Sequence, residues 1–241
     1  MAVSEKIQDT YDLAPDFPET EIFEKLSLSS KKEVETFKPR KIRYALSQRQ
    51  LHELIDSALD SSRLHGLMIR TQASTGLRVG ELVHLRMQDV NLSEGKIHVC
   101  YHDADNYTDR WHPKTESGIR MVKIPSSLSK ELSRFLKEEK RKHGYLFISN
   151  KGSCFYEESV TGFINKYAKI VKSIGHNIGS HTLRRTYASW LVYDGVPIGD
   201  VSKSLGHKSI QITMQYLYQI ENTASYERIG NSIDKLMKEE E

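Results

Sequence analysis

The sequence has little cysteine and no long apolar run. Its two cysteines, Cys100 and Cys154, stand too far apart for a zinc or redox motif, and they provide no disulfide framework. No segment approaches the roughly 20 apolar residues of a membrane helix. The N-terminus lacks the basic flank and apolar core of a secretory signal. We therefore expect a soluble cytoplasmic protein with no membrane partner.

Charge is plentiful but unevenly distributed. Charged residues make up 28% of the chain, and the net charge is +3. Residues 1–40 contain nine acidic and six basic side chains, so residues 41–241 carry a net charge of +6. This modest basic excess fits a nucleic-acid partner, and it also fits an ordinary, slightly basic enzyme. The proline-containing, charged residues 1–42 are expected to form a flexible or partly helical tail, and residues 43–241 a folded domain.

Hydrophobic periodicity predicts a mainly α fold with a small antiparallel β-sheet, an α+β arrangement. Helical spacing predicts helices after Ser47 and at 63–74, 78–83, 128–136, 157–173, 181–193, 198–205, 209–220 and 226–238. Alternating apolar residues at 97–101 and 122–124 predict two strands joined by a polar loop at 103–118. Residues 145–148 are a candidate for a short third strand.

Three segments carry candidate chemistry. The first, TGLRVGEL, contains Arg78, and the second, HTLRRT, contains His181 and Arg184. The third is LGHKSIQITMQYLY, in which Tyr216 follows His207 by nine residues. Each segment alone is a weak signal, but in this order they describe an anion site beside a nucleophile.

In these segments the chain resembles the tyrosine site-specific recombinases, which include phage integrases and Xer-type recombinases. The resemblance extends over residues 44–230. It implies the DNA breaking-rejoining catalytic fold and an enzyme that cleaves and rejoins double-stranded DNA through a covalent 3′-phosphotyrosine. It further implies a homotetramer on DNA, formed from a monomer or weak oligomer, and no metal or cofactor. The absence of a Walker P-loop agrees with a reaction that needs no ATP.

Carried over to this chain, the family pattern makes Tyr216 the nucleophile and His181 and His207 the two motif histidines. Arg78 and Arg184 become the clamp on the scissile phosphate. Two guanidiniums hold the nonbridging oxygens and keep their charge at neutral pH. A tyrosine with a pKa of about 10 needs such help, and His181 is a plausible proton acceptor.

The family also uses a lysine on the β-hairpin turn, and Lys114 is the best match. The segment from Arg78 to Lys114 is longer than in compact members, so Lys123 and Lys96 remain alternatives. Tyr218 is a second tyrosine close to Tyr216, but two residues on a helix point about 200° apart. Only one of these two phenols therefore faces the arginines.

Two acidic residues lie in or near the first motif, and one residue of the second motif differs from the usual family pattern. We expect Glu81 and Asp89 to orient arginines or cap backbone rather than to act as a catalytic carboxylate pair. Arg185 replaces the histidine that the family usually has beside Arg184.

Two other functions remain open. Residues 1–42 are too short for the family's core-binding domain, from which we expect weak, salt-dependent DNA affinity. This favours, as an alternative, a DNA-binding protein or regulator derived from an integrase. A type IB topoisomerase-like relaxing enzyme shares the chemistry, but the spacing of the motifs resembles a recombinase.

Overall fold

The computed structural model describes the backbone of residues 45–217 and the side chains of residues 45–214. The elements are, in chain order, α2 (Gln48–Ser61), α3 (Arg63–Thr75), α4 (Val79–Val83), η3 (Met87–Asp89), β1 (Val90–Asn91), β2 (Lys96–Val99), η4 (Glu116–Gly118), β3 (Arg120–Lys123), α5 (Ser126–Glu139), α6 (Glu157–Ile170), α7 (Ser180–Tyr193), α8 (Ile198–Leu205) and α9 (Ile210–Leu217). The expected tail at 1–42 and the expected helix at 226–238 lie outside the described residues. The predicted mainly helical fold with one small antiparallel sheet is confirmed.

Local signals fix the ends of the first helices. The Ser47 hydroxyl accepts a hydrogen bond from the Gln50 backbone N–H, while the Gln50 side chain accepts one from the Ser47 N–H. This reciprocal capping satisfies two donors at the start of α2. Helix α3 ends at Gly76, whose φ of 64° lies in the left-handed region that glycine adopts without strain.

The sheet has the order β1-β2-β3, and both pairings are antiparallel. Ile97 faces Val122 across the β2–β3 pair, and both side chains are buried, as their alternation predicted. The prediction of a strand at 145–148 was wrong, because Tyr145 forms only an isolated bridge with Arg86. The third strand is β1, whose two residues are too few to show alternation.

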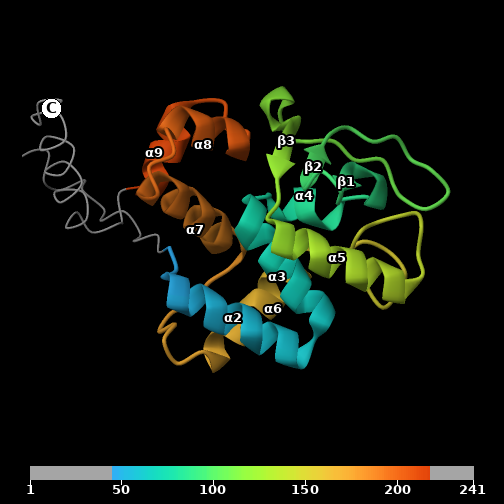
Figure 1. Cartoon of the computed structure of the whole chain (residues 1–241), viewed down its shortest axis with the longest axis horizontal. Coiled ribbons are helices and arrows are strands. Elements are labelled where there is room, and N and C mark those ends of the chain that lie inside the picture. The colour runs from blue at the N-terminus through green and yellow to red at the C-terminus, as the bar shows by residue number, and fades with distance from the viewer. Residues whose placement is uncertain (1–44, 218–241) are drawn as a thin grey trace, which may run out of the picture. The chain divides into compact units, whose positions relative to one another are not determined.

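The packing of α7 positions the candidate site. Helix α7 lies against α3, and α8 and α9 lie against α7 and against each other (Figure 1). A small cluster of Ala188, Val201 and Leu205 joins α7 to α8, whereas a larger core extends through α2, α3, α6 and the sheet. Helix α8 also contacts β3, so helices late in the chain meet the hairpin.

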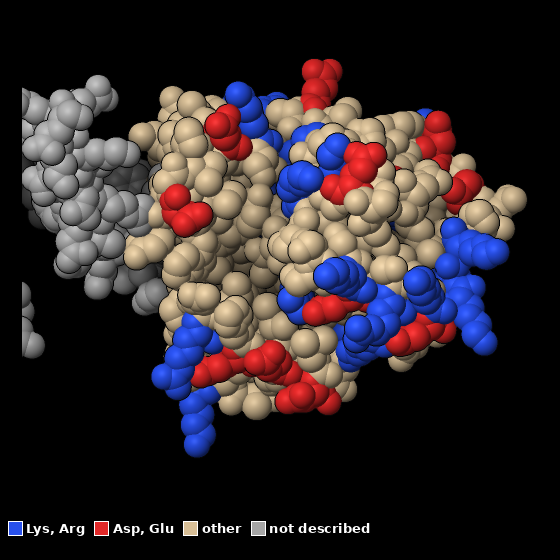
Figure 2. Space-filling view, viewed as in Figure 1, with Lys and Arg blue, Asp and Glu red and all other residues tan. Residues whose placement is uncertain are grey.

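Charges of both signs cover the surface. On the face shown in Figure 2, Lys and Arg side chains gather over α5, with Asp and Glu side chains between them. Exposed basic residues of α5 include Lys130, Arg134 and Lys137, which line a surface groove with Lys123 of β3.

Among helices within residues 45–217, none combines the length and apolar character needed to cross a bilayer.

Candidate active site

Main-chain carbonyls at the ends of two helices organise the candidate site. Helix α3 ends at Gly76 and α8 ends at Gly206, and both glycines are left-handed, with φ values of 64° and 65°. A Cβ atom on Gly206 would lie 2.7 Å from the Ser117 carbonyl oxygen, so η4 packs directly against this turn. The carbonyl groups of the two helix ends have no partner within their helices and accept from other groups.

Arg184 joins the two helix ends. It lies in the first turns of α7, and its guanidinium donates to the Gly76 and Leu205 carbonyls, each at 2.6 Å. The residue is only 2% exposed. Because α7 packs between α3 and α8, this buried arginine is held in one orientation.

Arg78 lies at the start of α4 and reaches the same turn. Its guanidinium donates to the Gly206 carbonyl at 2.8 Å and to the Glu81 carboxylate at 2.7 Å. The side chain is 25% exposed, and two of its five N–H donors form these bonds. Its other donors can therefore bind an anion from solution.

Glu81 binds a third arginine, Arg120, that the sequence reasoning missed. The Arg120 guanidinium contacts both Glu81 carboxylate oxygens, at 3.0 and 2.8 Å, and its Nε donates to the Ser204 carbonyl at 2.6 Å. Burial alone would raise the pKa of Glu81, but bonds and charges from Arg120 and Arg78 hold it below its ordinary value. The expected supporting role of Glu81 is confirmed, because it orients Arg78 and caps α4.

His207 follows directly after the turn. Its Nδ1 lies 2.8 Å from the hydroxyl of Thr213, a buried residue of α9. Burial and the guanidiniums of Arg184 and Arg78 lower the pKa of His207 to about 3. The imidazole is therefore neutral at neutral pH. The tautomer that accepts from Thr213 at Nδ1 carries its proton on Nε2.

His181 and Tyr216 lie on elements next to this cluster. His181 is exposed and precedes Arg184 by three residues on α7, which places both on one side of that helix. Tyr216 lies in α9, which packs against α7 and α8. The Tyr216 side chain is outside the described ones, so its expected orientation stays a prediction.

The three candidate lysines differ in position. Lys114 is exposed on the loop before η4, and no hydrogen bond or ion pair joins it to the arginine cluster within the described residues. Lys96 and Lys123 face each other across β2 and β3, and both contact Glu94. They lie at the end of the hairpin opposite Arg120, which is about 10 Å from Lys123 along β3.

Together these groups concentrate positive charge around one turn. Three guanidiniums surround residues 204–206, with one neutral imidazole beside them and one carboxylate between two of them. Planar guanidiniums with fixed orientation match the geometry of phosphate oxygens. The structure therefore brings Arg78, Arg184 and His207 together and adds Arg120.

Sequence comparison identifies related proteins. The profile described as the phage integrase family matches residues 44–222. A tyrosine recombinase XerC-like protein of Caldanaerobacter subterraneus is 32% identical over 203 residues, covering 75% of this chain and 49% of the relative. Transposase A from transposon Tn554 of Staphylococcus aureus is 28% identical over 178 residues, covering 73% of this chain and 48% of the relative. The chain thus spans about half the length of these relatives.

Structure comparison gives a consistent result. A crystal structure of XerA recombinase superposes with a TM-score of 0.67 and is 26% identical. The match covers 80% of this chain and 65% of that one. The chain therefore shares its fold with the matched part of that recombinase.

Proposed function

The chain belongs to the phage integrase family of tyrosine recombinases, and from this we propose that it is a site-specific DNA recombinase or integrase. It cleaves and rejoins DNA strands through a covalent 3′-phosphotyrosine. The observation that carries the proposal is the convergence of Arg78, Arg184 and His207 on the turn at Gly206. Relatives named recombinase and transposase support it.

The arginine cluster supplies electrostatic stabilisation. When a phosphodiester is attacked, negative charge accumulates on its nonbridging oxygens. The guanidinium of Arg78 has donors for one of these oxygens, and Arg184 binds the other after the groups that cover it move aside. Because Glu81 and the Gly206 carbonyl fix Arg78 before DNA binds, this guanidinium needs little reorganisation in the transition state.

Proton transfers accompany the attack. The Tyr216 oxygen forms a bond to phosphorus, and the bond from phosphorus to the 5′-oxygen breaks. His181 accepts the phenol proton, and Lys114 gives a proton to the leaving 5′-oxygen. Neutral His207 donates a hydrogen bond from Nε2 to a phosphate oxygen. Rejoining reverses these steps, so the energy of the phosphodiester is retained.

The partners follow from this reaction. The substrate is double-stranded DNA, and four protomers assemble on two DNA sites, from a monomer or weak oligomer in the free state. The protein acts in the cytoplasm and requires no cofactor for the strand transfer.

A trapping experiment tests the proposal. Duplexes tiled across the DNA that flanks the coding sequence, each with a nick near a different position, lose the short cleaved fragment and so trap the covalent intermediate. Wild-type protein and the matched control Tyr218→Phe should form an adduct that survives denaturing electrophoresis, whereas Tyr216→Phe should not. An adduct that persists in Tyr216→Phe but disappears in Tyr218→Phe would assign the nucleophile to Tyr218.

The burial of Arg184 favours one alternative. Its guanidinium is bound to two carbonyls and the residue is 2% exposed, so contact with a phosphate requires movement of the groups that cover it. A DNA-binding protein or regulator derived from an integrase would keep this buried arginine for stability alone. A shift of the same duplexes in native gels, without any covalent adduct, would support this alternative.

A further inference from the structure

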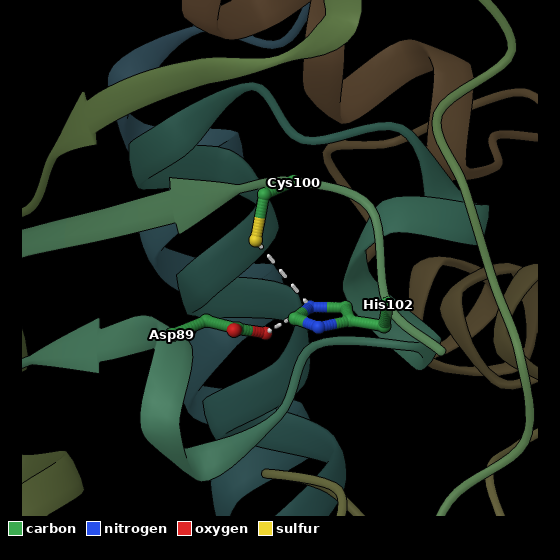
Figure 3. Close-up of side chains that lie close together, drawn as sticks. All are labelled: Asp89, Cys100 and His102. Atoms are coloured by element: carbon green, nitrogen blue, oxygen red, sulfur yellow. Dashed lines mark hydrogen bonds and ion pairs between the residues drawn. The ribbon is translucent and has the colours of Figure 1, made fainter. Parts of the chain in front are cut away.

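A cysteine, a histidine and an aspartate converge at the base of the loop between β2 and β3. Asp89 ends η3, Cys100 follows β2, and His102 comes two residues later. The His102 Nε2 atom lies 3.0 Å from Asp89 Oδ2 and 3.6 Å from Cys100 Sγ. Figure 3 shows the carboxylate and the sulfur both directed toward the imidazole. All three potential ligand atoms lie within 4.8 Å of one another.

Two potential ligand atoms share one imidazole nitrogen. A neutral ring nitrogen either carries a proton and donates, or has a lone pair and accepts. With its proton, Nε2 can bond strongly to the Asp89 carboxylate but only weakly to the Cys100 sulfur, which is a poor acceptor. A cation between the three atoms would satisfy all of them at once, because each would then contribute a lone pair.

The charge of Asp89 is available for such a cation. Arg86 donates to the carboxylate through its backbone N–H at 2.8 Å, whereas its guanidinium contacts the Asp105 carboxylate and the Asp103 carbonyl. Within residues 45–214, no Lys or Arg side chain forms an ion pair with Asp89. Asp89 and His102 are each 7% exposed, so solvent screens the carboxylate only weakly.

We propose that Asp89, Cys100 and His102 bind a thiophilic divalent cation, for which Zn²⁺ is the best match, with water as the fourth ligand. Sulfur, nitrogen and oxygen are the ligand atoms that Zn²⁺ prefers. Bond lengths of about 2.3 Å to sulfur and about 2.0 Å to nitrogen place these two atoms about 3.5 Å apart in a tetrahedron. The separation of 3.6 Å in the structure agrees with this geometry. Binding releases the thiol proton to solvent.

The bound cation would connect two segments that lie between Arg78 and Arg120 in the sequence. It would attach η3 to the strand extension, where His102 exchanges two main-chain hydrogen bonds with Trp111, of 2.9 and 3.0 Å. The loop that follows contains Lys114, so its base would be stabilised. This structural role does not depend on the proposed recombinase reaction.

Cobalt spectroscopy tests the site. The full chain is stripped with a chelator and titrated with Co²⁺, which should give one equivalent of thiolate-to-metal charge-transfer absorption that Zn²⁺ then displaces. Cys100→Ser should abolish this absorption, whereas the matched control Cys154→Ser should retain it. Zn²⁺ should raise the unfolding temperature of wild type and Cys154→Ser but not that of Cys100→Ser.

The readout is specific because the ten histidines of the chain offer other sites for metal that involve no sulfur. X-ray absorption on the wild-type zinc protein needs no substitution and should show one sulfur scatterer at about 2.3 Å. No charge-transfer band in wild type, an equal band in Cys100→Ser, or a zinc shell without sulfur would each overturn the proposal.

Discussion

The carboxylate of Glu81 should contribute more to stability than any exposed ion pair of this protein. It is 3% exposed and lies between Arg120, which is 7% exposed, and Arg78. The substitution Glu81→Gln keeps the shape of the side chain but removes its charge. The NH2 group of the glutamine then replaces one carboxylate oxygen and faces guanidinium N–H donors. Arg120 therefore loses both a charged partner and a hydrogen bond.

The expected cost can be estimated from this burial. Removing one partner of a buried ion pair costs about 3–5 kcal/mol, because the remaining charge stays uncompensated. Since glutamine retains one acceptor oxygen, the lower end of that range applies. With a denaturant slope of about 2 kcal/mol per M, a loss of about 3 kcal/mol lowers the urea midpoint by about 1.5 M.

Urea unfolding followed by circular dichroism measures this loss. The matched control is Glu138→Gln, because Glu138 pairs with Arg63 at the surface, where the two side chains are 52% and 43% exposed. That control should lose no more than about 1 kcal/mol. Equal midpoints for Glu81→Gln and Glu138→Gln would show that the Glu81 carboxylate does not hold the arginines together.

Three further substitutions test other parts of the site and fold. The pKa of His207 is about 3 in the folded protein, whereas its ordinary value is 6.5. As the pH falls, the imidazole is therefore protonated in the unfolded protein before it is protonated in the folded protein. Wild-type stability should therefore fall relative to His207→Gln as the pH decreases from 6.5 to 3, and a constant difference in urea midpoints would contradict this. Gly206→Ala should cost about 1–3 kcal/mol for its positive φ and more for the contact of its Cβ with the Ser117 carbonyl. Gly152→Ala, also at positive φ but without close contacts, is its control in thermal unfolding, and equal losses would exclude the clash. Ser47→Ala should lose about 1 kcal/mol with the N-cap of α2, and an unchanged unfolding temperature would argue against that cap.

The helices could be predicted because their signals are local. Residues 198–205 were predicted as a helix and form α8, since apolar spacing starts after a proline and ends at Gly206. The Ser47 cap and the Gly76 stop are equally local. The sheet was harder to predict, because β1 has two residues and depends on pairing with β2. The apolar run at 145–148 looked like a strand, but its partner segment continues into η3 after a single bridge.

Only the site residues that belong to a recognisable sequence motif could be predicted. Arg78, Arg184 and His207 were expected together, and the structure places all three at the same turn. Arg120 was not expected, because 39 residues separate it from Glu81 and a single arginine in a strand looks like a surface charge. The cluster of Asp89, Cys100 and His102 was missed because the three residues form no known metal-binding motif, and the pairing of β1 with β2 brings the aspartate to the other two.

The guanidiniums of this site depend more on backbone than on side chains. Arg184, Arg78 and Arg120 all donate to carbonyls at the C-terminal ends of α3 and α8. These acceptors cannot be removed by substituting a side chain, and they exist only if both helices end where they do. Because the arginines are fixed during folding, the entropic cost of orienting them would not fall on the proposed DNA binding. If that proposal holds, a substitution at Gly206 should weaken phosphate binding even though this residue offers no side chain to the substrate.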